Sequence, residues 1–208
     1  SPFNPFLEGI FYDLRGTMSG QVKINGSVTD PLMDGTLTLH KAGVGITYLK
    51  LNTDIQEGAR IKVNNKTFDI DNWLLTDTAY KTQATLNGSI RHNRLLDWFL
   101  DLKLQTLGKR FMVLNTPYTD DALFYGTAFM KGNATIKGAL DEIAIKVNAK
   151  TEEGTSFKIP LSDSESVGDD SFITFIEKGD KKVKVNRDLE SIKGLELNFE
   201  LDILPTAE

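Results

Sequence analysis

Apolar and polar residues alternate strictly along several stretches of this chain. Within residues 20–29, Val22 and Ile24 share one parity and polar side chains occupy the other. Successive side chains of a β-strand point to opposite faces, so this period of two predicts a strand with one apolar and one polar face. Stretches at residues 83–91 and 134–141 have the same pattern. The pattern predicts an almost entirely β protein.

Each of these three stretches contains a short repeated phrase, in which an aliphatic residue, a polar residue, a glycine and a small residue follow one another. The glycines are Gly26, Gly88 and Gly138, and each falls on the apolar face. Glycine inside a strand typically marks a bend or the close approach of another backbone. A second strand and a glycine-containing turn follow each phrase, which is typical of hairpins. The unequal spacing of the phrases indicates a degenerate hairpin repeat and not a regular solenoid.

Strands with one apolar face are not typical of a parallel sheet, whose central strands are apolar on both faces. Three arrangements satisfy the pattern: a β-sandwich, a closed barrel, and a curved, mostly antiparallel sheet around a partly open groove. Periodicity alone favours the sandwich or barrel, because soluble monomers rarely expose apolar patches above roughly a few hundred Å². An open groove would therefore imply an apolar ligand or partner. Short helical turns are allowed at residues 5–14 and 120–129.

The length, composition and net charge of the chain narrow the class of protein. The chain has 208 residues, of which 40% are hydrophobic, and we expect one elongated β domain over residues 1–208. Because the chain stops soon after a last alternating strand at residues 195–203, we expect it to be a fragment of a longer protein. The net charge of −5 argues against nucleic acid as a partner, since phosphate binding needs a basic surface.

The apolar faces of the strands are the main candidate site. In one interpretation they line a hydrophobic groove that solvates acyl chains, and in the other they form an ordinary dry core, which the residues alone favour. The candidate groove-lining residues are Val22, Ile24, Leu37, Leu39, Ile61, Val63, Leu86, Leu100, Leu102, Leu104, Ile136, Ile143, Ile145, Val147, Phe157 and Ile159.

No other chemistry stands out in the sequence. His40 and His92 are the only histidines, their spacing matches no metal motif and the chain has no cysteine, so neither a metal site nor a cofactor is expected. No G-x-S-x-G sequence presents a nucleophile, so we assign no catalytic residue and do not expect an enzyme. Trp73 and Trp98 would suit an alternative function, a ligand-binding β-sandwich such as an adhesin or a carbohydrate-binding module.

Several phrases, taken in order, resemble the C-terminal region of the TamB family of translocation and assembly module proteins, in the AsmA-like superfamily. The most distinctive is Leu123-Phe124-Tyr125-Gly126-Thr127-Ala128-Phe129, which Gly132 and Ile136-Lys137-Gly138 follow. Each phrase is a string of low specificity, and their order and spacing carry the resemblance. The other phrases lie at residues 11–20, 26–28, 31–37, 86–92, 113–116, 154–155 and 159–161.

The resemblance implies a long groove of repeated strands with an apolar lining, known as a β-taco, and it favours the open groove over the sandwich or barrel. It implies a protein of the periplasm of diderm bacteria, anchored to the inner membrane by an N-terminal helix. The implied roles are phospholipid transport toward the outer membrane and outer-membrane protein assembly. The implied partners are a phospholipid or other acyl-chain ligand and an outer-membrane barrel protein. The anchor and the barrel-docking region would lie outside this chain.

Overall fold

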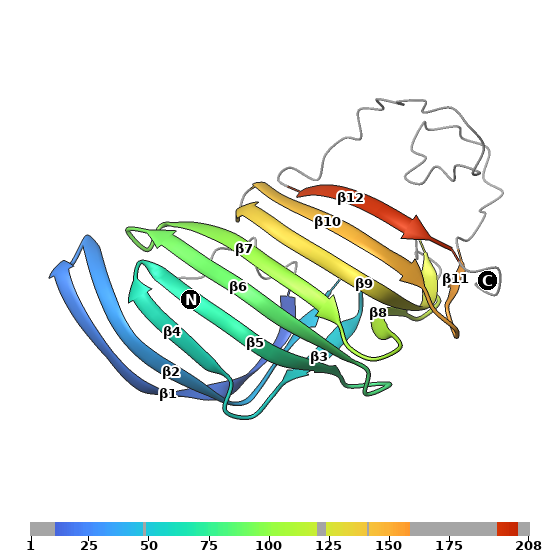
Figure 1. Cartoon of the computed structure of the whole chain (residues 1–208), viewed down its shortest axis with the longest axis horizontal. Coiled ribbons are helices and arrows are strands. Elements are labelled where there is room, and N and C mark those ends of the chain that lie inside the picture. The colour runs from blue at the N-terminus through green and yellow to red at the C-terminus, as the bar shows by residue number, and fades with distance from the viewer. Residues whose placement is uncertain (1–10, 48, 120–123, 141, 159–194, 204–208) are drawn as a thin grey trace.

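The computed structural model describes residues 11–47, 49–119, 124–140, 142–158 and 195–203 (Figure 1). Within these ranges every regular element is a β-strand, and no helix is long and apolar enough to cross a membrane. The strands are β1 (Phe11–Ser27), β2 (Asp30–Ile46), β3 (Leu51–Ile55), β4 (Arg60–Asn65), β5 (Thr67–Asp77), β6 (Gln83–Asn93), β7 (Asp97–Thr106), β8 (Phe111–Thr116), β9 (Tyr125–Ala139), β10 (Glu142–Thr151), β11 (Ser156–Lys158) and β12 (Leu195–Asp202).

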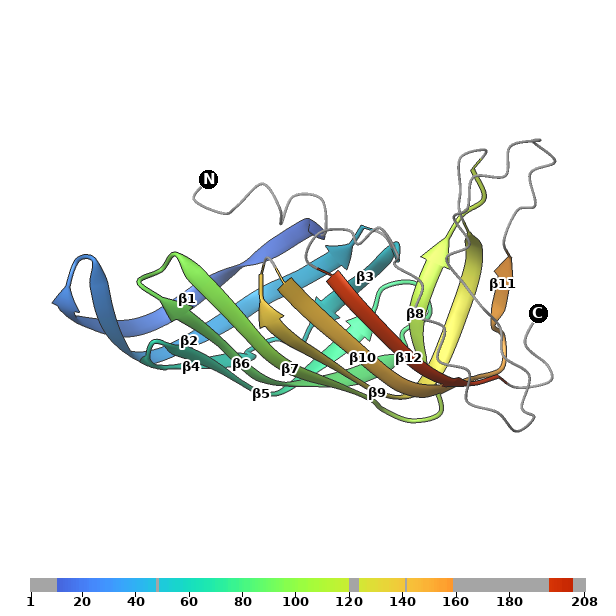
Figure 2. The same cartoon turned by 90° about the horizontal axis from the view of Figure 1, so that it is seen from above.

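The twelve strands form one sheet, in the order β1-β2-β3-β5-β6-β7-β9-β10-β12. Strand β4 pairs with β2 and β5, while β8 and β11 both pair with β9. Every pairing is antiparallel except that of β10 with β12. Figure 2 shows the sheet bent into a trough. The expected curved, mostly antiparallel sheet is confirmed, and the sandwich and closed-barrel alternatives do not describe it.

The sequence allowed short helical turns at residues 5–14 and 120–129. This expectation is wrong for the part of each segment that the structure describes. Strand β1 already begins at Phe11, and β9 begins at Tyr125. Both segments have cross-strand partners, since Tyr12 pairs with Gly45 on β2 and Gly126 pairs with Thr116 on β8. Pairing with a neighbouring strand therefore decides the structure of segments whose local sequence is ambiguous.

The bends come from irregular residues within the long strands. Asp13 in β1, Lys41 in β2 and Asn72 in β5 have positive φ angles near +49°, and the pairing registers of β1 and β5 shift close to Asp13 and Asn72. Such irregularities bend a strand and leave an N–H without its ladder partner. Side chains accept these hydrogens: the Lys41 N–H donates to Glu57 Oε2 at 2.8 Å, and the Asn72 N–H donates to Asn87 Oδ1 at 2.8 Å. The curvature is therefore fixed by specific hydrogen bonds.

An arginine fastens three strands together on the outer side of the bend. The Arg15 guanidinium of β1 lies directly over Gly43 of β2, where a larger residue would collide with it. It reaches β3, donating to Asn52 Oδ1 at 2.7 Å and to the Thr53 carbonyl at 3.0 Å, and it pairs with Asp54. The edge strand β1 is thus held to β3 although β2 lies between them.

The glycines on the apolar face have backbone conformations that leave no room for a side chain. Gly88 has φ +133°, and a Cβ added there would collide with the carbonyl oxygen of Asp101 on β7. Gly138 has φ +129° and would collide with the Glu142 carbonyl oxygen in the same way. The backbone that excludes a Cβ at these glycines belongs to the neighbouring strand of the same sheet, and not to another layer.

We expect the substitution Gly88→Ala to lower the free energy of unfolding by roughly 2–3 kcal/mol, because it adds a collision to a strained φ angle. Urea denaturation measures this change. Gly108→Ala is the matched control: Gly108 also has a positive φ, +66°, but nothing lies within 4 Å of its added Cβ. Equal losses in the two variants would show that the collision with the Asp101 carbonyl oxygen adds nothing at Gly88.

Candidate functional site

The pairing register places the predicted groove residues on one face of the sheet. Residues directly opposite each other on antiparallel strands present their side chains to the same face. Leu37 on β2 lies opposite Ile61 on β4, and Ile136 on β9 lies opposite both Leu102 on β7 and Ile145 on β10. We call this the apolar face. The predicted residues on it are Val22, Ile24, Leu37, Leu39, Ile61, Val63, Leu86, Leu100, Leu102, Leu104, Ile136, Ile143, Ile145 and Val147.

The two remaining candidates lie elsewhere. Phe157 is on β11, where it pairs with Gly126 at the far end of β9 and its ring stacks on that of Phe124 with centroids 5.6 Å apart. Ile159 lies outside the described residues. Among residues of the apolar face, Val63 is buried, Ile24 is 66% exposed and most of the others are partly buried. These side chains are therefore neither a sealed core nor a freely exposed surface.

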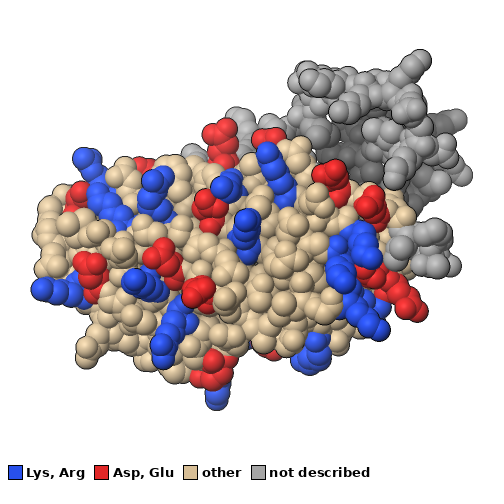
Figure 3. Space-filling model, in the orientation of Figure 1, with Lys and Arg blue, Asp and Glu red and all other residues tan. Residues whose placement is uncertain are grey.

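The apolar face is the concave side of the trough. Ala59, Ile70 and Trp73 are buried in one cluster, and partly buried side chains from strands on both sides of the bend pack against it. Side chains from the two arms of a bend converge only on its inner side. The partly buried members are Leu39, Ile55, Ile61, Leu86, Ile90 and Leu102. Figure 3 shows the opposite, outer face, over which basic and acidic side chains are both spread.

No second layer of described residues covers this concave face along the open part of the trough. The exposure is greatest on the edge strand β1, where Met18 and Ile24 remain 56% and 66% exposed. Apolar surface in contact with water is unfavourable at roughly 25 cal/mol per Å². Part of the apolar face is therefore in contact with water in the described part of the chain.

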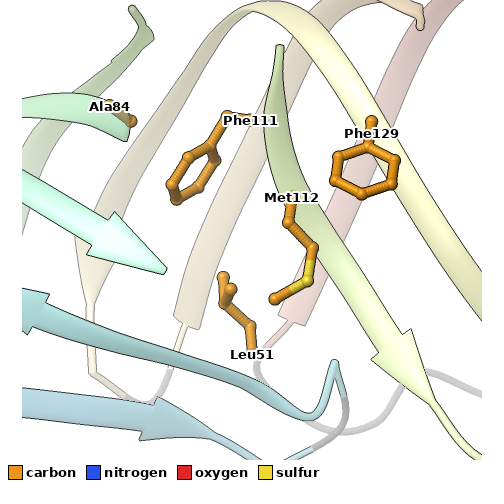
Figure 4. Close-up of a cluster of buried hydrophobic side chains, with 5 residues drawn as sticks. All are labelled: Leu51, Ala84, Phe111, Met112 and Phe129. Atoms are coloured by element: carbon orange, nitrogen blue, oxygen red, sulfur yellow. The ribbon is translucent and has the colours of Figure 1, made fainter. Parts of the chain in front are cut away.

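One end of the concave side is closed. Phe111 and Met112 of β8 are each 1% exposed, and they pack with Leu51, Ala84 and Phe129 into a second cluster (Figure 4). Strand β8 lies outside the main strand order and pairs with β9 alone. At this end the side chains form a closed core, while most apolar-face residues in the rest of the trough are partly buried.

Two hydrogen bonds hold β8 across the end of the trough. The Asn115 N–H donates to the Leu49 carbonyl at 3.0 Å, and the Met112 N–H donates to Thr82 Oγ1 at 2.8 Å. Thr82 is positioned in turn by the buried Asp77, whose carboxylate accepts the Thr82 N–H at 2.6 Å and the Tyr80 N–H at 2.6 Å. The β5–β6 turn therefore holds β8 in position. Sequence reasoning missed this closure, although the continuous apolar run at residues 111–114 is typical of a strand covered on both faces.

A buried histidine lies at the opposite end of the trough, where the β4–β5 and β6–β7 turns form its lip. His92 is 1% exposed, and its ring centroid lies 6.0 Å from that of Phe68 and 5.4 Å from that of Trp98. The Leu95 N–H donates to His92 Nδ1 at 3.2 Å, which leaves the hydrogen of the neutral ring on Nε2. Nε2 has no hydrogen-bond partner among the described residues. Burial lowers the pKa of His92, and the nearby charge of Lys66 lowers it further.

The lip also carries an ion pair. Lys66 Nζ lies 2.6 Å from Asp30 Oδ1, which joins the β4–β5 turn to the start of β2. The hydrogen bond from Lys66 lowers the pKa of Asp30, and the charges of Lys66, Arg94 and His92 act in the same direction. Two basic side chains therefore lie near one carboxylate beside the apolar face.

A serine, a histidine and a glutamate are joined in order on the outer face. Ser19 Oγ lies 2.8 Å from His40 Nε2, and His40 Nδ1 lies 2.7 Å from Glu57 Oε1. This order of groups is that of a nucleophile, a base and an orienting acid. All three residues are accessible, however, and Glu57 also accepts the N–H of the irregular residue Lys41, which lowers the pKa of Glu57 most. We interpret this series of hydrogen bonds as a structural connection between β1, β2 and the β3–β4 turn. The described residues contain no group of side chains able to hold a metal ion.

Acidification is expected to destabilise the fold through His92. Because the pKa of His92 is lowered in the folded state, the unfolded chain binds this proton more readily, so stability is complete above about pH 6.5 and falls as the pH decreases below it. The free energy of unfolding from urea titrations between about pH 7 and pH 5 should fall by at most about 1.4 kcal/mol per pH unit from this group. In a His92→Phe variant this slope should be lost. An unchanged slope would mean that His92 is not the responsible group.

Comparison with known proteins gives one match. A family model described as the TamB C-terminal domain matches residues 71–208, more than half of the chain. No curated protein and no solved structure matches. The matched part includes β6 to β12, and therefore the apolar-face residues from Leu86 to Val147.

Proposed function

Because the chain belongs to the TamB family, we propose that its apolar face is one segment of a groove that guides phospholipids toward the outer membrane, supports outer-membrane protein assembly, or does both. Residues 1–208 would act as a single elongated β domain without enzymatic activity. The protein would lie in the periplasm of a diderm bacterium, anchored to the inner membrane by a helix outside this chain. Its contact with an outer-membrane barrel protein would likewise use regions outside the chain.

One observation carries the proposal: an apolar face continues over eight strands, and no described element covers its open part. Each methylene of an acyl chain contributes about 0.8 kcal/mol when it is buried. A chain of about sixteen carbons would gain on the order of 10 kcal/mol before the cost of ordering it. Burial of this kind has no fixed direction, so an acyl chain can move from strand to strand without breaking a specific bond.

The alternative function, an adhesin or carbohydrate-binding sandwich, lacks support in this fold. It needs two closed sheets and exposed aromatic rings on one platform. Trp73 is 7% exposed and its Nε1–H donates to the Arg60 carbonyl at 2.7 Å, while Trp98 packs against Phe68 and His92. The Trp73 ring is therefore buried, and one face of the Trp98 ring is occupied by Phe68.

Mass spectrometry of small molecules extracted from natively purified protein tests the proposal. We expect phospholipid or another acyl-chain compound to accompany the protein, and we expect Ile145→Lys to reduce the amount at least several-fold, because a charge on the apolar face disfavours acyl chains. Ser89→Lys is the matched control, since Ser89 lies on the outer face opposite both Asp69 and Asp101. An absence of acyl compounds, or equal amounts in a folded Ile145→Lys variant, would contradict the proposal.

A further inference from the structure

We propose that Lys66 and Arg94, at the lip of the trough, bind the phosphate of an amphiphile whose acyl chain lies on the apolar face. The inference rests on the proposed function and adds a binding site for the polar end of the ligand. The chemical class of the ligand is therefore a phosphate-bearing amphiphile, and not a neutral one.

The two basic residues belong to adjacent turns. Lys66 is in the β4–β5 turn, Arg94 is in the β6–β7 turn, and the His92 N–H donates to the Lys66 carbonyl at 3.0 Å to join the two turns. Figure 1 shows both turns at the same border of the sheet. The strands that enter this border carry Phe68 and Ile90, which lie opposite each other on the apolar face. We place the polar end of the ligand beside these turns, with its acyl chain extending over Phe68 and Ile90 on the apolar face.

The charges at this lip leave positive charge in excess. The side chain of Lys66 is 31% exposed and is paired with Asp30, and Arg94 is exposed and forms no ion pair within the described part of the chain. Of the other charged residues here, Arg91 lies over the Phe99 ring at 5.0 Å, and Asp97 accepts a hydrogen bond from Asn93. Arg94 therefore remains available to an anion, and Lys66 can share its ammonium between Asp30 and a second acceptor, since an ammonium has three donors.

His92 is a second observation that points to a ligand. Its Nε2–H is a buried donor without an acceptor, and buried polar groups normally have a hydrogen-bond partner. His92 also lies close enough to Lys66 for the lysine charge to lower its pKa. A phosphate held by Lys66 would bring to this corner more acceptor oxygens than one cation can satisfy. A neutral alcohol or ester headgroup supplies neither the charge nor that number of acceptors.

Binding of two amphiphiles with the same acyl chain to the full chain tests the site. Palmitoyl lysophosphatidylglycerol carries a phosphate, monopalmitoylglycerol does not, and both are titrated below their aggregation concentrations. We expect the phosphate-bearing compound to bind about tenfold more tightly, because charged hydrogen bonds are stronger than neutral ones. Arg94→Gln and the double variant Lys66→Gln/Arg94→Gln should lose this preference and keep their affinity for monopalmitoylglycerol. Lys66→Arg, which retains the charge, should keep the preference.

The control variant is Lys103→Gln, which removes one charge from the outer face and should change neither affinity. Equal binding of both amphiphiles to the unmodified chain, or an unchanged preference in the double variant, would overturn the lip site while leaving the groove intact. Failure of both amphiphiles to bind would overturn the proposed function together with the lip site. Inorganic phosphate is titrated alone, and if it bound as tightly as the lysophospholipid, the site would be a simple phosphate site independent of the groove.

Discussion

The structure depends on keeping the parity of apolar residues in phase across a single layer of strands. From β1 to β10, most residues of the apolar face lie opposite another apolar residue or a glycine on the next strand, as Leu102 faces Ile136 and Gly88. A slip of one residue at any pairing would turn the apolar side chains of that strand to the outer face. The bend in β5 respects this constraint, because Ile70 and Trp73, on either side of the irregular residue Asn72, belong to the same buried cluster.

The same apolar pattern serves two purposes within one trough. At one end β8 folds over the sheet, and Phe111, Met112 and Phe129 give the domain a dry core that a single layer would lack. Along the rest of the trough, neighbouring strands bury one another's side chains only in part, so the face remains accessible. The fold is thus held by strand pairing, by the closed end and by the cluster around Ala59, Ile70 and Trp73 at the bend.

The strands and the common face of the apolar residues could be predicted from the sequence. Alternation is a local pattern, and a period of two is the period of a β-strand. The positions of β8 and of the lip could not, because they depend on contacts between distant segments. The Met112 N–H meets Thr82, and His40 meets Ser19 and Glu57, through pairings that no local pattern encodes. The short helical turns failed for a related reason, since Phe11 and Tyr125 lie in segments that become strands by pairing. His92 was noted only as a poor metal ligand, and its burial between two turns became visible only in the fold.

Thiol accessibility tests the central claim, that the apolar face is open, most directly. The natural chain has no cysteine, so single cysteines at Val22 and Ile145 on the apolar face, and at Lys23 and Lys146 on the outer face, can be labelled one at a time. The account predicts that all four react with a maleimide in delipidated protein, and that a bound lysophospholipid protects only the two on the apolar face. If the cysteines at Val22 and Ile145 were unreactive in folded, delipidated protein, the face would be a sealed core and the account would be wrong.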